Sequence, residues 1–207
     1  MRYTKNEKEE EIAKDLRKLK RSGVNIISVT ADGRKAIKKA VLSVFSNVIY
    51  QRCLVHIQRY AEIYLTQNPK TEAGRELKQI VKLLNNINNH LAKRTWLARL
   101  NEWQRKYHYF LKEKTYHEEA KRWWYTHRNI RRVIYHINQA LPDMFNYLDY
   151  PDTPKDTNRL EGRFTDLKHK LRDHRGLKKT KRENYFNWYL HYKNQEEKER
   201  KTNRYEY

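Results

Sequence analysis

The sequence predicts a mostly helical α/β fold, in which two short parallel strands precede a long series of helices. Near the N-terminus, two short β-branched segments at 24–30 and 48–52 alternate with amphipathic segments, which is the order of a right-handed βαβ unit. After residue 54, apolar residues recur at helical spacing and no further strand pattern follows. Hydrophobic residues make up only 38% of the chain, but 16 Tyr and 5 Trp supply large side chains for a core.

The first elements are predicted from their apolar spacing. Ile12, Leu16 and Leu19 recur at i, i+4 and i+7, with acidic residues before them and basic residues after. Residues 5–21 are therefore expected to form a helix. Segment 24–30 (VNIISVT) is apolar and β-branched, as in a buried strand of a parallel sheet.

The next elements complete the βαβ unit. The pair Asp32-Gly33 ends the first strand. A helix is expected next, with apolar positions at Ile37, Val41 and Val44, followed by a second strand at about 48–52.

Residues 68–150 are predicted to be an all-helical insertion. A helix from Leu54 is expected to end at Asn68-Pro69, and three further helical patterns follow within 77–91, 96–110 and 123–141. We interpret the Trp and Tyr residues in these patterns as core rather than as a base-stacking platform, because they recur at helical spacing.

The C-terminal region is predicted to contain two more helices. Leu160, Phe164, Leu167 and Leu171 form one apolar face, and Glu161 lies on the neighbouring face. A last helix is expected around 185–192, before a charged tail. The expected organisation is a partial core at 1–67, the insertion at 68–150, a core helix plus a C-terminal helix at 151–192, and the tail at 193–207.

Charge and composition narrow the function classes. Lys and Arg number 46 against 25 Asp and Glu, a net charge of +21, which favours a polyanionic partner, above all nucleic acid. An RNA-binding or ribosome-associated protein would satisfy the charge alone. The single Cys53 excludes an internal disulfide framework and any zinc site that needs two cysteines from this chain. The sequence contains no apolar run long enough for a membrane span, and its N-terminus has no apolar run of the kind found in a secretory signal.

Three short motifs could carry chemistry. Asp32 follows a buried strand, where open α/β sheets place their ligands. Cys53-x-x-His56 follows the second strand, and Asn158-x-x-Glu161 opens an amphipathic helix. Each has a structural alternative. Asp-Gly is usually a turn, a lone Cys-x-x-His is usually packing, and Asn158-x-x-Glu161 is equally a helix-capping pattern with Asn158 as the cap.

Together the motifs resemble a known family. The segments VTADGRKAI, QRCLVHIQR and TNRLEGRFTDLKHKLRDHRGL resemble the conserved blocks of DDE transposases of the Mutator-type group of bacterial insertion sequences, over about residues 5–192. The resemblance implies an RNase H-like core with a helical insertion. It implies DNA transposition by metal-dependent strand cleavage and transfer, with Asp32 as the second catalytic aspartate and Glu161 as the catalytic glutamate. Cys53, His56 and Asn158 belong to accessory motifs.

The cofactor implied by this family is Mg²⁺ or Mn²⁺ in a two-metal arrangement held by Asp32 and Glu161. Magnesium takes oxygen ligands and keeps few from the protein. Two such ions can activate a water or a 3′-hydroxyl and stabilise the leaving oxygen. A zinc site built on Cys53, His56 and a further histidine such as His169 is the less favoured alternative.

One family feature is not found in this sequence. The first catalytic aspartate of the family lies on a strand within a three-stranded segment that precedes the first helix, whereas this chain begins at Met1, directly before that helix. We therefore expect a C-terminal fragment that lacks the first three strands, the first aspartate and the N-terminal DNA-binding region. Such a fragment would not cut DNA at a useful rate alone. The alternative is a non-catalytic basic DNA-binding protein derived from a transposase.

The expected partners are DNA (transposon ends and target), a second copy of the chain, or a chain that carries the N-terminal transposase piece. The expected location is the cytoplasm, at the nucleoid. Basic residues beside the motifs are expected to contact DNA phosphates. These residues are Arg52, Arg59, Arg163, Lys168, Arg172 and Arg175.

Overall fold

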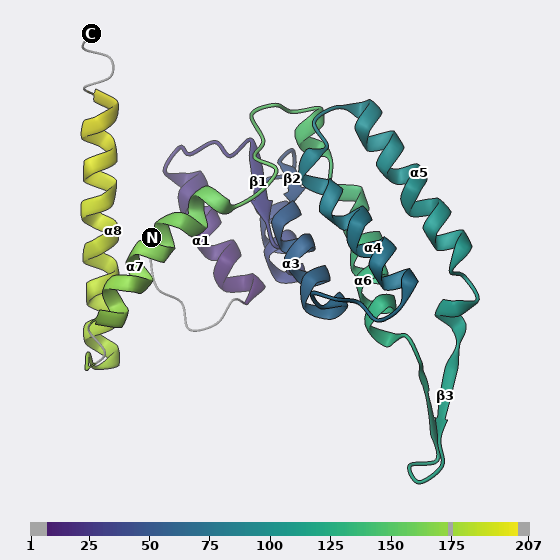
Figure 1. The fold of residues 1–207 in the computed structure, drawn as a ribbon. Coiled ribbons are helices and arrows are strands. Elements are labelled where there is room, and N and C mark those ends of the chain that lie inside the picture. The colour runs from purple at the N-terminus through teal and green to yellow at the C-terminus, as the bar shows by residue number, and fades with distance from the viewer. Residues whose placement is uncertain (1–7, 174–175, 203–207) are drawn as a thin grey trace.

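A computed structural model describes residues 8–173 and 176–202 of the chain (Figure 1). It confirms the mostly helical α/β fold, with two small two-stranded sheets. Within these residues, no helix is both long enough and apolar enough to cross a bilayer. The assignment to an RNase H-like core and the proposed domain boundaries stay predictions.

The βαβ unit is confirmed. Strands β1 (Ser28–Ala31) and β2 (Ile49–Arg52) pair in parallel, with Ser28 opposite Ile49 and Ala31 opposite Arg52. Helix α2 (Lys35–Val44) connects them, and helix α1 (Glu9–Arg21) packs against α2. Their shared core is built from seven buried residues: Ala13, Ala40, Val41, Val44, Phe45, Val48 and Tyr50.

The expectation of a fully buried first strand is wrong. All four residues of β1 are only half-buried, and Ile27 just before it is 69% exposed. A single strand neighbour does not explain this exposure, since β2 also has only one among the described residues and three of its four residues are buried. The difference is that the turns at 141–143 and 146–148 pack against β2. Apolar β-branched composition therefore predicted a strand here, but its bounds were wrong, since residues 24–27 precede the strand, and its burial was overstated.

A second and larger core lies between four helices: α3 (Leu54–Leu65), α4 (Glu72–Lys82), α5 (His90–Lys106) and α6 (Arg128–Ala140). Trp96 and Trp103 are buried in it, as expected from their helical spacing. Their indole N–H groups donate to the backbone oxygens of Ile80 at 2.8 Å and Ala73 at 3.0 Å. Each ring thereby packs in the core without leaving a buried donor unpaired.

The helix expected over 77–91 is divided in the structure. A 3₁₀ turn, η1 (Leu83–Asn86), follows α4, and a new helix starts after Asn89, whose side chain accepts from the Ala92 N–H at 2.8 Å. An asparagine cap of this kind satisfies one of the free N–H groups of the first turn. Three further 3₁₀ turns lie at η2 (Phe110–Lys112), η3 (Leu141–Asp143) and η4 (Asn146–Leu148).

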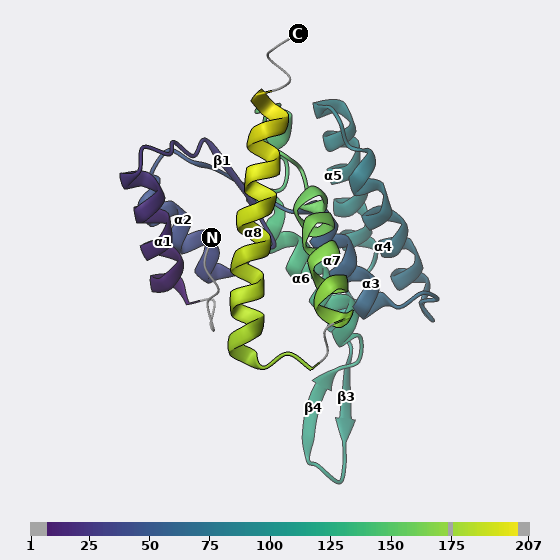
Figure 2. The same ribbon diagram turned by 90° about the vertical axis from the view of Figure 1, so that its left-hand side faces the viewer.

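The expectation of an all-helical insertion is wrong at 114–125. Strands β3 (Lys114–His117) and β4 (Arg122–Tyr125) form an antiparallel hairpin that projects from the helices (Figure 2). Trp123 and Trp124 therefore lie in a strand rather than in a helix. The physical reason is local, because Thr, Tyr and Trp favour strands and this segment is rich in them.

The C-terminal helices α7 (Asn158–Asp173) and α8 (Lys179–Thr202) lie on the opposite side of the molecule from α5 (Figure 1). Tyr189 in α8 donates to Asp166 in α7 at 2.6 Å, which joins the two. The predicted tail beginning at residue 193 is helical as far as Thr202. Lys, Glu and Arg are good helix formers and pair along the helix, as Lys193 does with Glu196 at 2.8 Å.

Candidate active site

The three motifs meet at the carboxyl ends of the two parallel strands. The Cys53 N–H continues the sheet by donating to Ala31 at 2.8 Å. The loop that precedes α7 is fastened to the same edge: the Thr30 hydroxyl donates to the Pro154 oxygen at 2.6 Å, and the Leu54 N–H donates to the Lys155 oxygen at 3.1 Å. Segments more than a hundred residues apart are thus joined where α/β sheets usually bind ligands.

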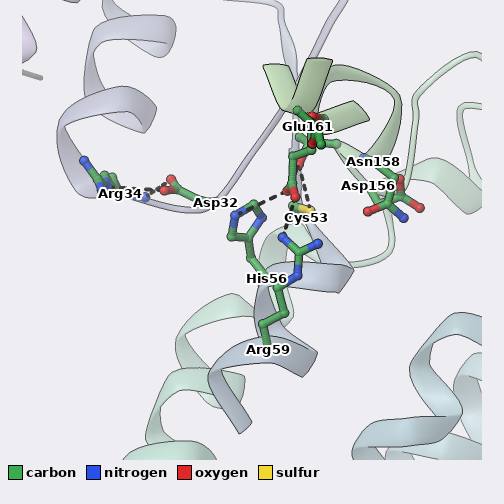
Figure 3. Close-up of polar contacts among 10 residues, drawn as sticks. Asp32, Arg34, Cys53, His56, Arg59, Asp156, Asn158 and Glu161 are labelled. Atoms are coloured by element: carbon green, nitrogen blue, oxygen red, sulfur yellow. Dashed lines mark hydrogen bonds and ion pairs between the residues drawn. The ribbon is translucent and has the colours of Figure 1, made fainter. Parts of the chain in front are cut away.

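Glu161, in the first turn of α7, is the most connected residue of this edge. Its carboxylate accepts from Arg59 at 2.5 Å and from the Thr157 hydroxyl at 3.2 Å, and His56 Nε2 lies 3.7 Å from it. Figure 3 shows His56 and Arg59, both from α3, turned toward this carboxylate. The Arg59 hydrogen bond holds the pKa of Glu161 below its ordinary value, so the carboxylate is ionised at neutral pH.

Cys53 and His56 lie directly beneath Glu161 at the start of α3. The buried Cys53 thiol is 3.4 Å from the Thr157 hydroxyl, which links the cysteine to the glutamate through one residue. His56 is about one-third exposed at its side chain, at 35%. Its other nitrogen, Nδ1, is buried without a hydrogen-bond partner in the described part of the chain.

Asp32 follows β1 at the same edge, but its carboxylate is turned away from Glu161. One oxygen accepts from the Arg34 backbone N–H at 3.0 Å, and the other is 3.3 Å from Arg34 Nε. Figure 3 shows this side chain directed toward Arg34. The sheet edge therefore carries both predicted acids, each paired with an arginine.

Arg52 is placed differently from the expectation that it contacts DNA. Its side chain is buried, with Nη2 3.0 Å from His136 Nε2. The guanidinium lies against Gly33, where a Cβ would fall 0.6 Å from Arg52 Nη1. Arg52 thus supports the Asp32-Gly33 turn from inside the protein, with its side chain buried rather than exposed. Burial lowers its pKa.

The other predicted residues lie along α7. Helix α7 begins at Asn158, so the capping interpretation with Asn158 before the first turn is wrong by one residue: Thr157 precedes the helix and bonds Glu161. Lys168 and Arg172 are exposed and follow Glu161 at i+7 and i+11. The side chain of Arg163 and all of Arg175 lie outside the described residues.

Two site residues were not anticipated from the sequence. Arg34 pairs with Asp32, and Thr157 connects Cys53 to Glu161. Thr157 was identifiable in principle, since a threonine directly before a helix is a common cap. The pairing of Arg34 depends on the backbone turn at Gly33, whose φ is 84°, and residue spacing does not reveal it.

The donor atoms at this edge suit a hard cation only in part. Carboxylate oxygens are the ligands that Mg²⁺ prefers. However, within residues 8–173 and 176–202 no group of three or more His, Cys, Asp and Glu side chains is arranged to hold a metal ion. A metal would therefore have to displace Arg34 and Arg59 and gain further ligands from elsewhere.

Comparison with known proteins identifies the family. A search of curated proteins found no match. The family model described as Transposase, Mutator family matches residues 1–141, which include Asp32, Cys53, His56 and the four helices α3 to α6, whereas Glu161 lies beyond the match. Since this match covers more than half of the 207 residues, the chain belongs to the Mutator family of transposases.

Proposed function

We propose that this chain contributes two carboxylates, Asp32 and Glu161, to a metal-dependent site for DNA strand cleavage and transfer. The observation that supports the proposal most is the fastening of the α7 loop to the strand ends through Thr30 and Pro154. That bond holds the helix bearing Glu161 at the edge where Asp32 emerges. An RNase H-like arrangement of the core belongs to the same proposal.

The proposed metal is Mg²⁺ or Mn²⁺, held by the two carboxylates together with water and DNA phosphate oxygens. When bound, it would lower the pKa of a coordinated water or 3′-hydroxyl and stabilise charge on the leaving oxygen. The third carboxylate that the family resemblance implies would come from another segment or chain.

Two arginines have a defined role in this proposal. Arg34 and Arg59 neutralise the carboxylates in the structure. Once a cation takes their place, each guanidinium becomes available to a DNA phosphate, for which its planar pair of donors is well suited. The site would thus exchange an internal ion pair for a substrate contact.

The test is Mn²⁺ binding and DNA nicking by the full chain. Electron paramagnetic resonance would follow free Mn²⁺ during titration with wild type, D32N, E161Q and the double variant. E102Q, at an exposed glutamate on α5, serves as the matched control. We expect weak binding in wild type and E102Q that is lost in the double variant. Equal binding by all of these proteins would overturn the proposal.

The second candidate is a non-catalytic DNA-binding protein with the same core. The specific observation in its favour is that both acids are already satisfied by arginines. It predicts tight DNA binding without Mn²⁺ binding, and no effect of D32N or E161Q on DNA affinity. The titration above, repeated with DNA present, separates the two candidates.

A further inference from the structure

The β3–β4 hairpin projects from the helices (Figures 1 and 2), and it carries exposed aromatic side chains. Its register pairs Tyr116 with Trp123 and Lys114 with Tyr125, so strand alternation puts these four side chains on one face. We call these four residues the aromatic face. Trp123 is 64% exposed, Tyr116 44% and Tyr125 39%, and the Tyr116 and Trp123 rings lie 4.7 Å apart.

The ribbon is secured at its base by contacts that do not involve the Tyr116 and Trp123 rings. Thr126 bonds back to Glu113 at 3.0 Å through its N–H and to Thr115 at 2.8 Å through its hydroxyl. His127 stacks on Phe110 with centroids 3.5 Å apart. A lone two-stranded hairpin is only marginally stable in water. These contacts, together with that of Tyr125 with Arg131 in α6, attach the hairpin to the helical body, so burial of the Tyr116 and Trp123 rings is not what joins it to the core.

Charge indicates what the aromatic face binds. The only charged member of the face is Lys114, whose Nζ lies 5.7 Å from the Tyr125 ring centroid, and the Arg131 guanidinium lies 3.6 Å from the same centroid. Cations beside exposed rings suit nucleic acid, which offers phosphates together with base faces. A second copy of this chain would bring its own charge of +21 against the same surface, which disfavours self-association there.

We propose that the aromatic face is a stacking platform for unpaired DNA bases, with Trp123 as its central ring. The ligand must be unpaired because a paired duplex keeps its base faces stacked inside. The inference rests on the proposed function only in taking DNA as the substrate. It requires neither a metal ion nor Asp32 and Glu161, so the two proposals can fail separately.

The test compares two labelled DNAs by fluorescence anisotropy, with the full chain and EDTA present. One is a fully paired duplex and the other is the same duplex with a short single-stranded overhang. Stacking on one ring changes affinity by about fivefold or more, so W123A should weaken overhang binding by at least about that factor and leave the paired duplex within about twofold. W188A removes another exposed tryptophan (57% exposed) from α8 and should change neither affinity.

A second measurement keeps the proposal testable if W123A disturbs the hairpin. W123F retains a ring and should restore most of the overhang affinity. The difference between the wild-type and W123F emission spectra reports the fluorescence of Trp123. The overhang DNA should quench this fluorescence if a base stacks on the ring.

Three outcomes would overturn the platform. One is unchanged overhang affinity in W123A. Another is an equal loss on both DNAs, which would indicate electrostatic docking. The third is loss of a dimer in W123A by sedimentation velocity, with DNA affinity retained. Because EDTA removes metal ions, a negative result here leaves the Mn²⁺ titration as an independent test of the active site.

Discussion

Protonation of His136 is expected to loosen the support beneath the Asp32-Gly33 turn. An arginine can only donate hydrogen bonds, so His136 Nε2 must accept from Arg52 Nη2 across their 3.0 Å contact. That role requires a neutral imidazole. The ring is also stacked on Tyr60 with centroids 3.9 Å apart. Burial, and next the charge of Arg52, lower the pKa of His136 from 6.5 to about 4.

The magnitude follows from proton linkage. The folded state binds this proton more weakly than the unfolded state, so stability is lost as pH falls through the unfolded value of 6.5 and the loss ends near the folded value of about 4. A gap of that size corresponds to a limit of about 3.4 kcal/mol, at 1.36 kcal/mol for each pKa unit. By pH 5 the loss should reach about 2 kcal/mol.

The assay is urea unfolding at a series of pH values between 7 and 4.5, for wild type and H136Q. Glutamine offers an acceptor to Arg52 and does not titrate. The difference between the two free energies of unfolding cancels the groups that both proteins share, and it should fall by about 2 kcal/mol between pH 7 and pH 5. H108Q, at an exposed histidine, should follow the wild-type curve. A difference curve that stays flat from pH 7 to pH 5 would refute the reasoning.

Three further predictions follow from the same contacts. G33A should destabilise the fold by about 1–2 kcal/mol or more, because φ at Gly33 is 84° and the new Cβ would overlap Arg52 Nη1. G162A, with open space around it in α7, should be neutral or raise stability by up to about 1 kcal/mol. Urea unfolding measures the stability of both variants. R59A should raise the pKa of Glu161 in an NMR titration, and an unchanged pKa would contradict the assigned cause. The half-exposed ion pair itself contributes only about 0–1 kcal/mol to stability, and this contribution is lost as pH falls through the lowered Glu161 pKa. DNA affinity should fall steeply with salt. If Lys168 and Arg172 each contact one phosphate of a duplex, K168A and R172A should each reduce the slope of log affinity against log salt concentration by about 0.9. An unaltered slope would show that these residues are not in the interface.

The sequence was most informative where a pattern repeated. The βαβ unit and the helix bearing Trp96 and Trp103 were predictable because several residues at one spacing indicate the same element. The hairpin is not predictable in this way, because the helical spacing of the residues after Trp123 and Trp124 extends across both tryptophans and predicts a helix there. A strand of four residues offers too few positions to show its own period. The expectation that these aromatic residues lie in the core is therefore confirmed for Trp96 and Trp103 in α5, which are buried, and wrong for Trp123, which is exposed to solvent.

The site shows a different limit of sequence reasoning. Asp32, His56 and Glu161 could be chosen from motifs, and the structure brings their segments to one edge. Their arginine partners are harder to predict, because Arg59 meets Glu161 only in the folded chain and the pairing of Arg34 with Asp32 depends on the turn at Gly33. Arg52 illustrates the difference. As a basic residue beside a motif it suggests a phosphate contact, yet desolvating a guanidinium is costly. Here the buried guanidinium of Arg52 gains a hydrogen bond to His136 and packs in the space that Gly33 leaves open, and these contacts offset part of the desolvation cost. Its position explains why the turn after β1 needs a glycine, and it makes the geometry of Asp32 depend on a buried charge rather than on the Asp-Gly sequence alone.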